Sequence, residues 1–159
     1  MVWVDVFIAV SLLAMALIDL RSRYIYDVHV VITGLLICVR LLGSDYFSHF
    51  LGAGAGFLVG FFMYKAAFYY YREEAFGFGD VLLLMLLGLY FGWPLFLHYF
   101  AVCYMLIGLV IVVPVILRPK LLKASVPMAP FYIFGAFAYK FMGSPDCLEF
   151  VGSLIEYIG

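Results

Sequence analysis

GFGDVLLLMLLGLYFGWPLFL, residues 77–97, places one acidic residue, Asp80, at the mouth of an otherwise apolar segment. A charged side chain costs roughly 2.5–3.5 kcal/mol at the centre of a membrane helix, so an acidic residue in such a setting usually marks function. Gly77 and Gly79 leave the backbone beside Asp80 without side chains, so that a second backbone can come close. The segment therefore predicts a membrane helix that begins at a functional carboxylate.

The composition of the whole chain predicts a membrane protein with little soluble mass. Of its 159 residues, 68% are hydrophobic, and the mean hydropathy is +1.16. A typical soluble domain is roughly 45–50% apolar. The net charge of −1 gives no sign of a nucleic-acid partner. The lipid bilayer is the partner that this composition implies.

Six apolar segments divide the chain, and we expect them to form about six transmembrane helices of an all-α protein, at about 20 residues per span. They cover residues 2–19, 28–43, 50–71, 80–97, 98–117 and 127–143. No internal repeat or linker separates them, so residues 1–159 are predicted to form a single membrane domain. The N-terminus lacks a basic region, which favours a retained first span over a cleaved signal peptide.

The basic residues of the loops predict how the chain is oriented. They follow the first, third and fifth segments, as Arg21, Arg23, Arg72, Arg118, Lys120 and Lys123. Positive residues collect on the cytoplasmic side of a membrane. We therefore expect a multi-pass protein of the cytoplasmic membrane with both termini on the outer side.

Three glycines of the third segment are spaced for close helix packing. Gly52, Gly56 and Gly60 recur every four residues and so share one helical face. Small residues let membrane helices approach each other closely. We expect these glycines to serve packing rather than chemistry.

Two carboxylates are placed to act together. Asp19 ends the first apolar segment and Asp80 opens the fourth, so both are predicted at the same depth on the inner side. If these helices are neighbours, the two carboxyl groups share one site and cannot both ionise easily. One can then take a proton from water while the other donates a hydrogen bond to a substrate carbonyl. This is the chemistry of aspartic proteases.

Each acidic residue of the inner side also has a structural interpretation. Asp80 can cap the N-terminus of the fourth helix, and Asp27 that of the second helix. Asp19 can pair with Arg21 or Arg23 at the interface. Glu74 can simply face water in its loop. The residues taken singly leave these alternatives open.

Three separated motifs together resemble one family of membrane proteases. They are IDLRSRYIYD at residues 18–27, EAFGFGD at 74–80 and VPMAPF at 126–131. In order and spacing they resemble the type IV prepilin peptidases and the archaeal preflagellin peptidases, which are intramembrane aspartyl proteases with a Gly-x-Gly-Asp motif. The resemblance extends over nearly the whole chain.

The resemblance implies roles for particular residues. The family's first catalytic aspartate ends the first core helix, as Asp19 does, and its second closes the Gly-x-Gly-Asp motif, as Asp80 does. An acidic residue eight positions after the first aspartate matches Asp27, and a glutamate just before the motif matches Glu74. These two are expected to attract the basic part of a substrate.

The resemblance also implies the reaction. The expected substrate is a prepilin-like precursor, a pilin or archaellin, with a short basic leader that ends in glycine ahead of an apolar helix. Cleavage is expected at the cytoplasmic membrane boundary, where Gly77 and Gly79 would leave room for the substrate strand. No cofactor is implied, and His29, His49 and His98 lack the spacing of metal ligands.

The chain departs from the family pattern at three points. Leu82 stands where members often have lysine, and Tyr26 stands where they often have proline. The larger bacterial members carry a Cys-rich methyltransferase domain ahead of the core. The chain resembles the minimal form without that domain.

Two other functions fit parts of the pattern. Presenilins and signal peptide peptidases share the Gly-x-Gly-Asp motif, and Tyr26-Asp27 with Ala129-Pro130 faintly resembles their other motifs. In this chain, however, Asp27 lies two apolar segments before the motif. A proton-coupled transporter would use Asp19 and Asp80 as a relay, but it predicts inverted repeats and interrupted helices, which the sequence does not show.

Overall fold

The computed structural model describes residues 2–43, 46–71, 77–117 and 128–142, and all regular structure in these ranges is α-helical. The helices are α1 (Val2–Ser22), α2 (Asp27–Arg40), α3 (Tyr46–Tyr71), α4 (Phe78–Phe91), α5 (Leu95–Leu117) and α6 (Ala129–Met142). The predicted all-α class is confirmed for the described residues. Each predicted segment corresponds to one helix, with bounds that differ by a few residues.

The largest difference in bounds lies between the fourth and fifth segments. Residues 95–97 were expected at the end of the fourth helix, but they belong to α5. Gly92 has a φ of 74°, in the left-handed region that glycine adopts readily, and it follows the last residue of α4. The chain therefore turns at residues 92–94 and starts α5 earlier than its hydropathy predicts.

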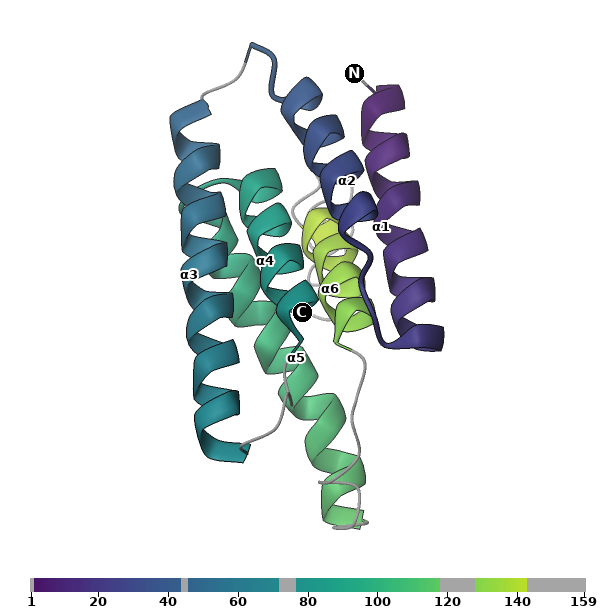
Figure 1. Ribbon diagram of the computed structural model, residues 1–159, viewed down its shortest axis with the longest axis vertical. Coiled ribbons are helices and arrows are strands. Elements are labelled where there is room, and N and C mark those ends of the chain that lie inside the picture. The colour runs from purple at the N-terminus through teal and green to yellow at the C-terminus, as the bar shows by residue number, and fades with distance from the viewer. Residues whose placement is uncertain (1, 44–45, 72–76, 118–127, 143–159) are drawn as a thin grey trace, which may run out of the picture.

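The helices alternate in direction along the chain (Figure 1). As a result, α1, α3 and α5 end at the lower end of the bundle in this view, while α2, α4 and α6 begin there. We call this the lower end, and the opposite one the upper end. Helices α3 and α5 both extend further down than the starts of α4 and α6 (Figure 1).

Helix α4 runs through the middle of the core. Its side chains are buried over most of its length, including Val81, Leu84 and Leu87, each at most 1% exposed. Helices α2, α3, α5 and α6 all contact it. Asp80 therefore stands at the entrance to the most enclosed helix of the described structure.

The glycines of α3 allow its backbone to touch that of α4, as predicted. A Cβ atom added to Gly52 or Gly56 would collide with a backbone oxygen of α4, and one at Gly60 would lie 3.0 Å from the Cα of Val81. On the opposite face of α3, a Cβ at Gly54 would meet nothing within 4 Å. The packing role expected for the glycines at four-residue spacing is confirmed.

The outside of the bundle has the character of a membrane protein. Two helices are long and apolar enough to cross a bilayer, Trp3–Ser22 and Tyr46–Tyr70, and two shorter apolar helices cover Phe78–Phe91 and Leu95–Val110. Large apolar side chains also point outward, among them Phe62, which is 74% exposed. Soluble proteins seldom expose extended apolar surface of this kind.

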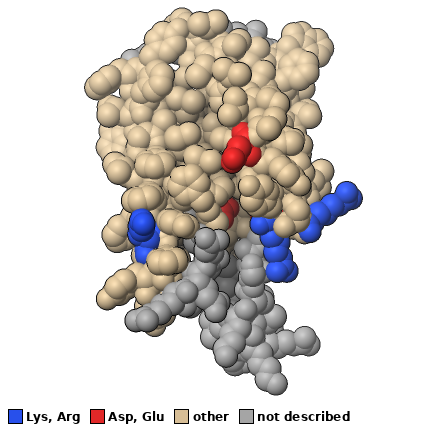
Figure 2. All heavy atoms as spheres, viewed as in Figure 1, with Lys and Arg blue, Asp and Glu red and all other residues tan. Residues whose placement is uncertain are grey.

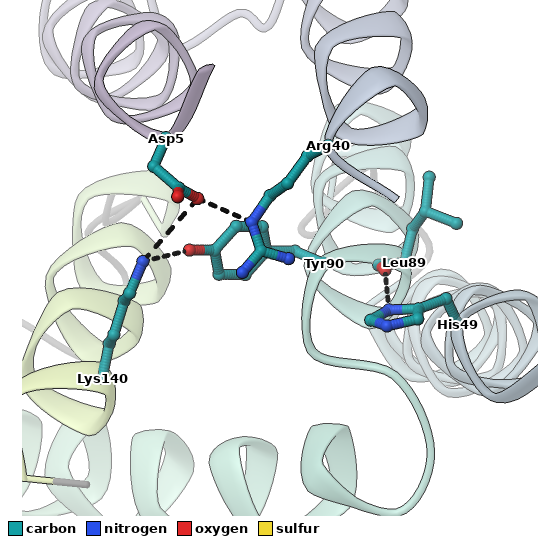
Figure 3. Close-up of polar contacts among 6 residues, drawn as sticks. All are labelled: Asp5, Arg40, His49, Leu89, Tyr90 and Lys140. Carbon is teal, nitrogen blue, oxygen red and sulfur yellow. Dashed lines mark hydrogen bonds and ion pairs between the residues drawn. The ribbon is translucent and has the colours of Figure 1, made fainter. Parts of the chain in front are cut away.

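At the upper end, a polar cluster joins four helices (Figure 3). The Arg40 Nε atom of α2 lies 2.6 Å from Asp5 Oδ1 of α1, and its guanidinium stands 4.8 Å from the ring centre of Tyr90 in α4. Lys140 of α6 donates a hydrogen bond of 2.6 Å to the Tyr90 hydroxyl. The cluster holds the upper ends of α1, α2, α4 and α6 together.

Candidate active site

Asp19 is buried near the lower end of α1, with 6% of its surface exposed. Its Oδ2 atom accepts a hydrogen bond of 3.1 Å from the backbone N–H of Ala129, the first residue of α6. The first N–H groups of a helix have no partner inside the helix, and a carboxylate placed there also interacts favourably with the helix dipole. Asp19 therefore caps α6 from a distant part of the chain.

The sequence did not predict the surroundings of Asp19. Helix α1 was expected to end at this residue, but it continues to Ser22, whose hydroxyl donates a hydrogen bond of 2.9 Å to the carbonyl of Ile18. Arg21 and Arg23 are exposed, and among the described residues neither forms an ion pair with Asp19. The interpretation of Asp19 as the partner of a neighbouring arginine is thus wrong. Arg23 acts on it through longer-range electrostatics.

Asp80 lies in the first turn of α4 and is partly buried. The residue at the N-cap is Gly77, whose carbonyl accepts a hydrogen bond of 3.1 Å from the backbone N–H of Asp80. The N-cap interpretation of Asp80 is therefore wrong. The corresponding interpretation of Asp27 is also wrong, because Tyr26 is the N-cap of α2 and Asp27 is its first helical residue.

Asp19 and Asp80 both lie at the lower end, but among the described residues α1 and α4 do not contact each other, and α2 and α6 each contact both of them. The two carboxyl groups lie within electrostatic range of each other. The structure describes no hydrogen bond between them. Helices α2, α4 and α6 begin at this same end (Figure 1). The N-terminus of a helix attracts negative charge.

The other predicted site residues take different positions. Gly77, at the N-cap of α4, and Asp27, the first residue of α2, are both exposed. The space beside Gly79 is occupied by Ile25, because a Cβ on Gly79 would lie 2.9 Å from the Cβ of Ile25. Ile25 is itself buried, with 7% exposed. Glu74 lies outside the described residues, as do Arg72, Arg118, Lys120, Lys123 and Pro127.

Sequence reasoning missed a group of tyrosines beside Asp80. The hydroxyl groups of Tyr104 in α5 and Tyr132 in α6 are hydrogen-bonded to each other, and both lie within electrostatic range of Asp80. Tyr99 of α5 donates a hydrogen bond of 2.7 Å to the backbone carbonyl of Tyr132. The chain has 13 tyrosines, and no spacing separates these three from the rest.

Basic side chains surround the lower end on the outside. On the face shown in Figure 2, Lys and Arg lie toward the lower part of the described surface, and the upper part carries none. The basic residues of the lower part of α1 and α3 are Arg21, Arg23 and Lys65, all exposed. The described residues contain no group of three or more His, Cys, Asp or Glu side chains that is arranged to hold a metal ion.

Comparison with known proteins gives one match. The sequence model of the type IV leader peptidase family matches residues 6–116, more than half of the chain. The matched range contains Asp19, Asp27 and the motif at residues 77–80, and it ends before α6. No curated protein and no solved structure matches the chain.

Proposed function

Because the chain belongs to the type IV leader peptidase family, we propose that it is an intramembrane aspartyl endopeptidase that removes the short basic leader of prepilin-like precursors. Asp19 and Asp80 form its catalytic pair. The observation that carries this proposal is the location of these two carboxyl groups at the same end of the bundle, within electrostatic range of each other and inside the range that the family matches. The family match favours a protease over a transporter.

The pair suits the hydrolysis of a peptide bond. One carboxylate takes a proton from water as the water oxygen bonds to the scissile carbonyl carbon, and the other, protonated, carboxyl group gives its proton to the carbonyl oxygen. The tetrahedral intermediate then returns that proton and breaks its C–N bond, while the leaving nitrogen takes the proton that came from water. Both carboxyl groups end in their starting states, so the cycle repeats.

The hydrogen bond from Ala129 supports this role for Asp19. A catalytic group works when its orientation is held close to the reactive geometry. The N–H of Ala129 holds one carboxylate oxygen of Asp19, and the second oxygen stays available for water or substrate. Asp80 is oriented differently, by its place in the first turn of α4.

One exposed acidic residue at the lower end supports the substrate class, against the repulsion that the exposed Arg21, Arg23 and Lys65 of the same end exert on a basic leader. Asp27 is exposed at the start of α2 and would attract a basic leader, with Glu74 as a second acidic contact. Such attraction is screened beyond about 8 Å in physiological salt. Gly77 is exposed beside Asp80 and gives the substrate strand an unobstructed backbone.

We further propose that residues 1–159 form one protease domain of the cytoplasmic membrane, with six spans and both termini outside. The alternating helix directions in Figure 1 and the exposed basic residues of the lower end support this orientation. Helices α2, α4 and α6 have 14 residues each. They reach about 21 Å, less than the hydrocarbon core of about 30 Å. A helix this short cannot reach both surfaces of the core, so the start of α4, with Asp80, lies at the cytoplasmic boundary if the other end of α4 stops short of the outer surface.

A cleavage experiment tests the proposal. The protein is reconstituted in phosphatidylethanolamine and phosphatidylglycerol vesicles with a precursor whose basic, glycine-ending leader precedes an apolar helix. We expect the wild type to release the leader, seen by gel mobility and mass spectrometry, and Asp19→Asn and Asp80→Asn to release none. Asp5→Asn, at the upper end, is the control and should retain cleavage. Full cleavage by either dyad variant would contradict the proposal.

A further inference from the structure

The tyrosines beside Asp80 form a hydrogen-bonded group that the dyad alone does not explain. The Tyr104 hydroxyl bonds to the Tyr132 hydroxyl and lies 3.1 Å from the sulfur of Met63 in α3. Tyr132 is fully buried. The group therefore joins α3, α5 and α6 through polar atoms inside an apolar core.

Helix packing places this group at the level of Asp80. Tyr132 follows Ala129 by about one turn of α6, and Ala129 is the residue that contacts Asp19. On the other side, Met63 follows Gly60 by about one turn of α3, and Gly60 packs against Val81, the neighbour of Asp80. The two tyrosine hydroxyl groups thus lie between Ala129, which contacts Asp19, and Val81, which follows Asp80 in the chain. Both hydroxyl groups are within electrostatic range of the Asp80 carboxyl group, as this placement requires.

The hydroxyl protons of this group are unequally satisfied. Each tyrosine has one hydroxyl proton. One proton lies between the two oxygen atoms, and the other points from Tyr104 to the sulfur of Met63. A thioether sulfur is a weak acceptor, whereas a carboxylate accepts a hydrogen bond about twice as strong as a neutral one. The Tyr104 proton therefore has a better acceptor nearby than the one that it uses in this structure.

We propose that Tyr104 is a positioning residue of the dyad, whose hydroxyl moves its hydrogen bond from Met63 to the carboxyl group of Asp80 when substrate is bound. The proposal rests on the function proposed above. Tyr132 holds the Tyr104 oxygen at this level, and the move needs a side-chain shift, because no hydrogen bond joins Tyr104 to Asp80 in this structure. The bond fixes the Asp80 carboxyl group in its reactive orientation.

The test compares kcat and KM of Tyr104→Phe with those of the wild type on the precursor and vesicles described above. Loss of a hydrogen bond to a charged group is expected to lower kcat about 10- to 100-fold. KM should stay within about twofold, because Tyr104 acts through Asp80 and not on the bound leader. Tyr104→Phe with a wild-type kcat overturns the proposal, and so does a loss that appears in KM alone.

Two variants separate positioning from general damage to the core. Tyr99→Phe removes a buried hydroxyl of the same group that bonds to a backbone carbonyl, so it should lower the melting temperature and keep kcat. Met63→Leu removes the competing sulfur, so it should retain a kcat at least equal to the wild type. If either variant lowers kcat as much as Tyr104→Phe, the hydroxyl has no special relation to Asp80 and the proposal fails. Cleavage by the wild type, with none by Asp19→Asn or Asp80→Asn, shows separately that the proposed function stands.

Discussion

The backbone N–H of Ala129 donates a hydrogen bond of 3.1 Å to Oδ2 of Asp19, across 110 positions of the chain. The bond ties the end of α1 to the start of α6 at a buried site. Asp19 thus has a structural function, capping a helix, in addition to its proposed catalytic one. The two functions make different demands on the side chain, since capping needs an acceptor oxygen and catalysis needs an acid.

Substitutions at Asp19 should separate these two functions. Asp19→Asn keeps an oxygen that accepts from Ala129, so its stability should stay within about 1 kcal/mol of the wild type. Asp19→Ala leaves the N–H buried without a partner and should cost about 1–3 kcal/mol. Both variants should lose leader cleavage. Unfolding in mixed micelles, followed by circular dichroism, measures the difference, and equal stabilities would show that the bond to Ala129 contributes little.

Much of the fold follows from local sequence. The remaining parts are set by contacts between residues that are distant in the chain. Apolar length gave the six helices, and the spacing of Gly52, Gly56 and Gly60 gave the contact with α4, because both are properties of short stretches. The cap on Asp19 depends on where α6 begins, which the first helix does not encode. The predicted end of α4 was wrong because hydropathy continues through a turn that Gly92 sets by its backbone conformation.

Only part of the candidate site could be predicted from the sequence, for the same reason. Asp19 and Asp80 were expected at one depth, and both lie at the lower end of the bundle, on helices that are joined through α2 and α6 and not directly. The N-cap interpretations of Asp80 and Asp27 were wrong, because the caps of α4 and α2 fall on Gly77 and Tyr26. Tyr104 and Tyr132 were missed, because nothing in an apolar helix distinguishes one tyrosine from another. Their role depends on hydrogen bonds to residues of other helices.

Alanine at two neighbouring glycines of α3 should have opposite effects on stability. At Gly56 a Cβ would collide with the backbone oxygen of Leu84, which cannot move without shifting α4. Gly56→Ala should therefore cost about 1–3 kcal/mol. At Gly54 the space is open, so Gly54→Ala should gain up to about 1 kcal/mol from helix propensity. Melting temperatures of the two variants decide this, and a neutral Gly56→Ala would argue against the close approach of α3 to α4.

The two glycines of the motif should respond differently to alanine. Gly79→Ala pushes on the buried Ile25 and should lower both the melting temperature and the rate of cleavage. Gly77→Ala fits the described backbone, because Gly77 has a φ of −73° and a Cβ there would lie 3.5 Å from Asp80 Oδ2. It should leave the melting temperature unchanged and lower kcat/KM severalfold by narrowing the path of the substrate strand. A Gly77→Ala variant with unchanged kcat/KM would remove Gly77 from the proposed substrate contact.

The ion pair between Asp5 and Arg40 should stabilise the bundle without affecting cleavage. It is formed at 2.6 Å with both side chains about 30% exposed, and Arg40 also stands over the ring of Tyr90 (Figure 3). Replacing Arg40 with Met keeps the aliphatic stem and removes the pair and the ring contact, so it should cost about 0.5–2 kcal/mol. Lys140→Met is the comparison variant: it removes a longer ion pair of 3.9 Å and an exposed hydrogen bond to Tyr90, and since Lys140 is more exposed than Arg40 its loss should be smaller. Since this cluster lies at the opposite end of the bundle from Asp19 and Asp80, kcat of Arg40→Met should equal that of the wild type at a temperature where both are folded. A lower kcat would mean that the upper ends of α1, α2 and α4 help to set the geometry of the dyad.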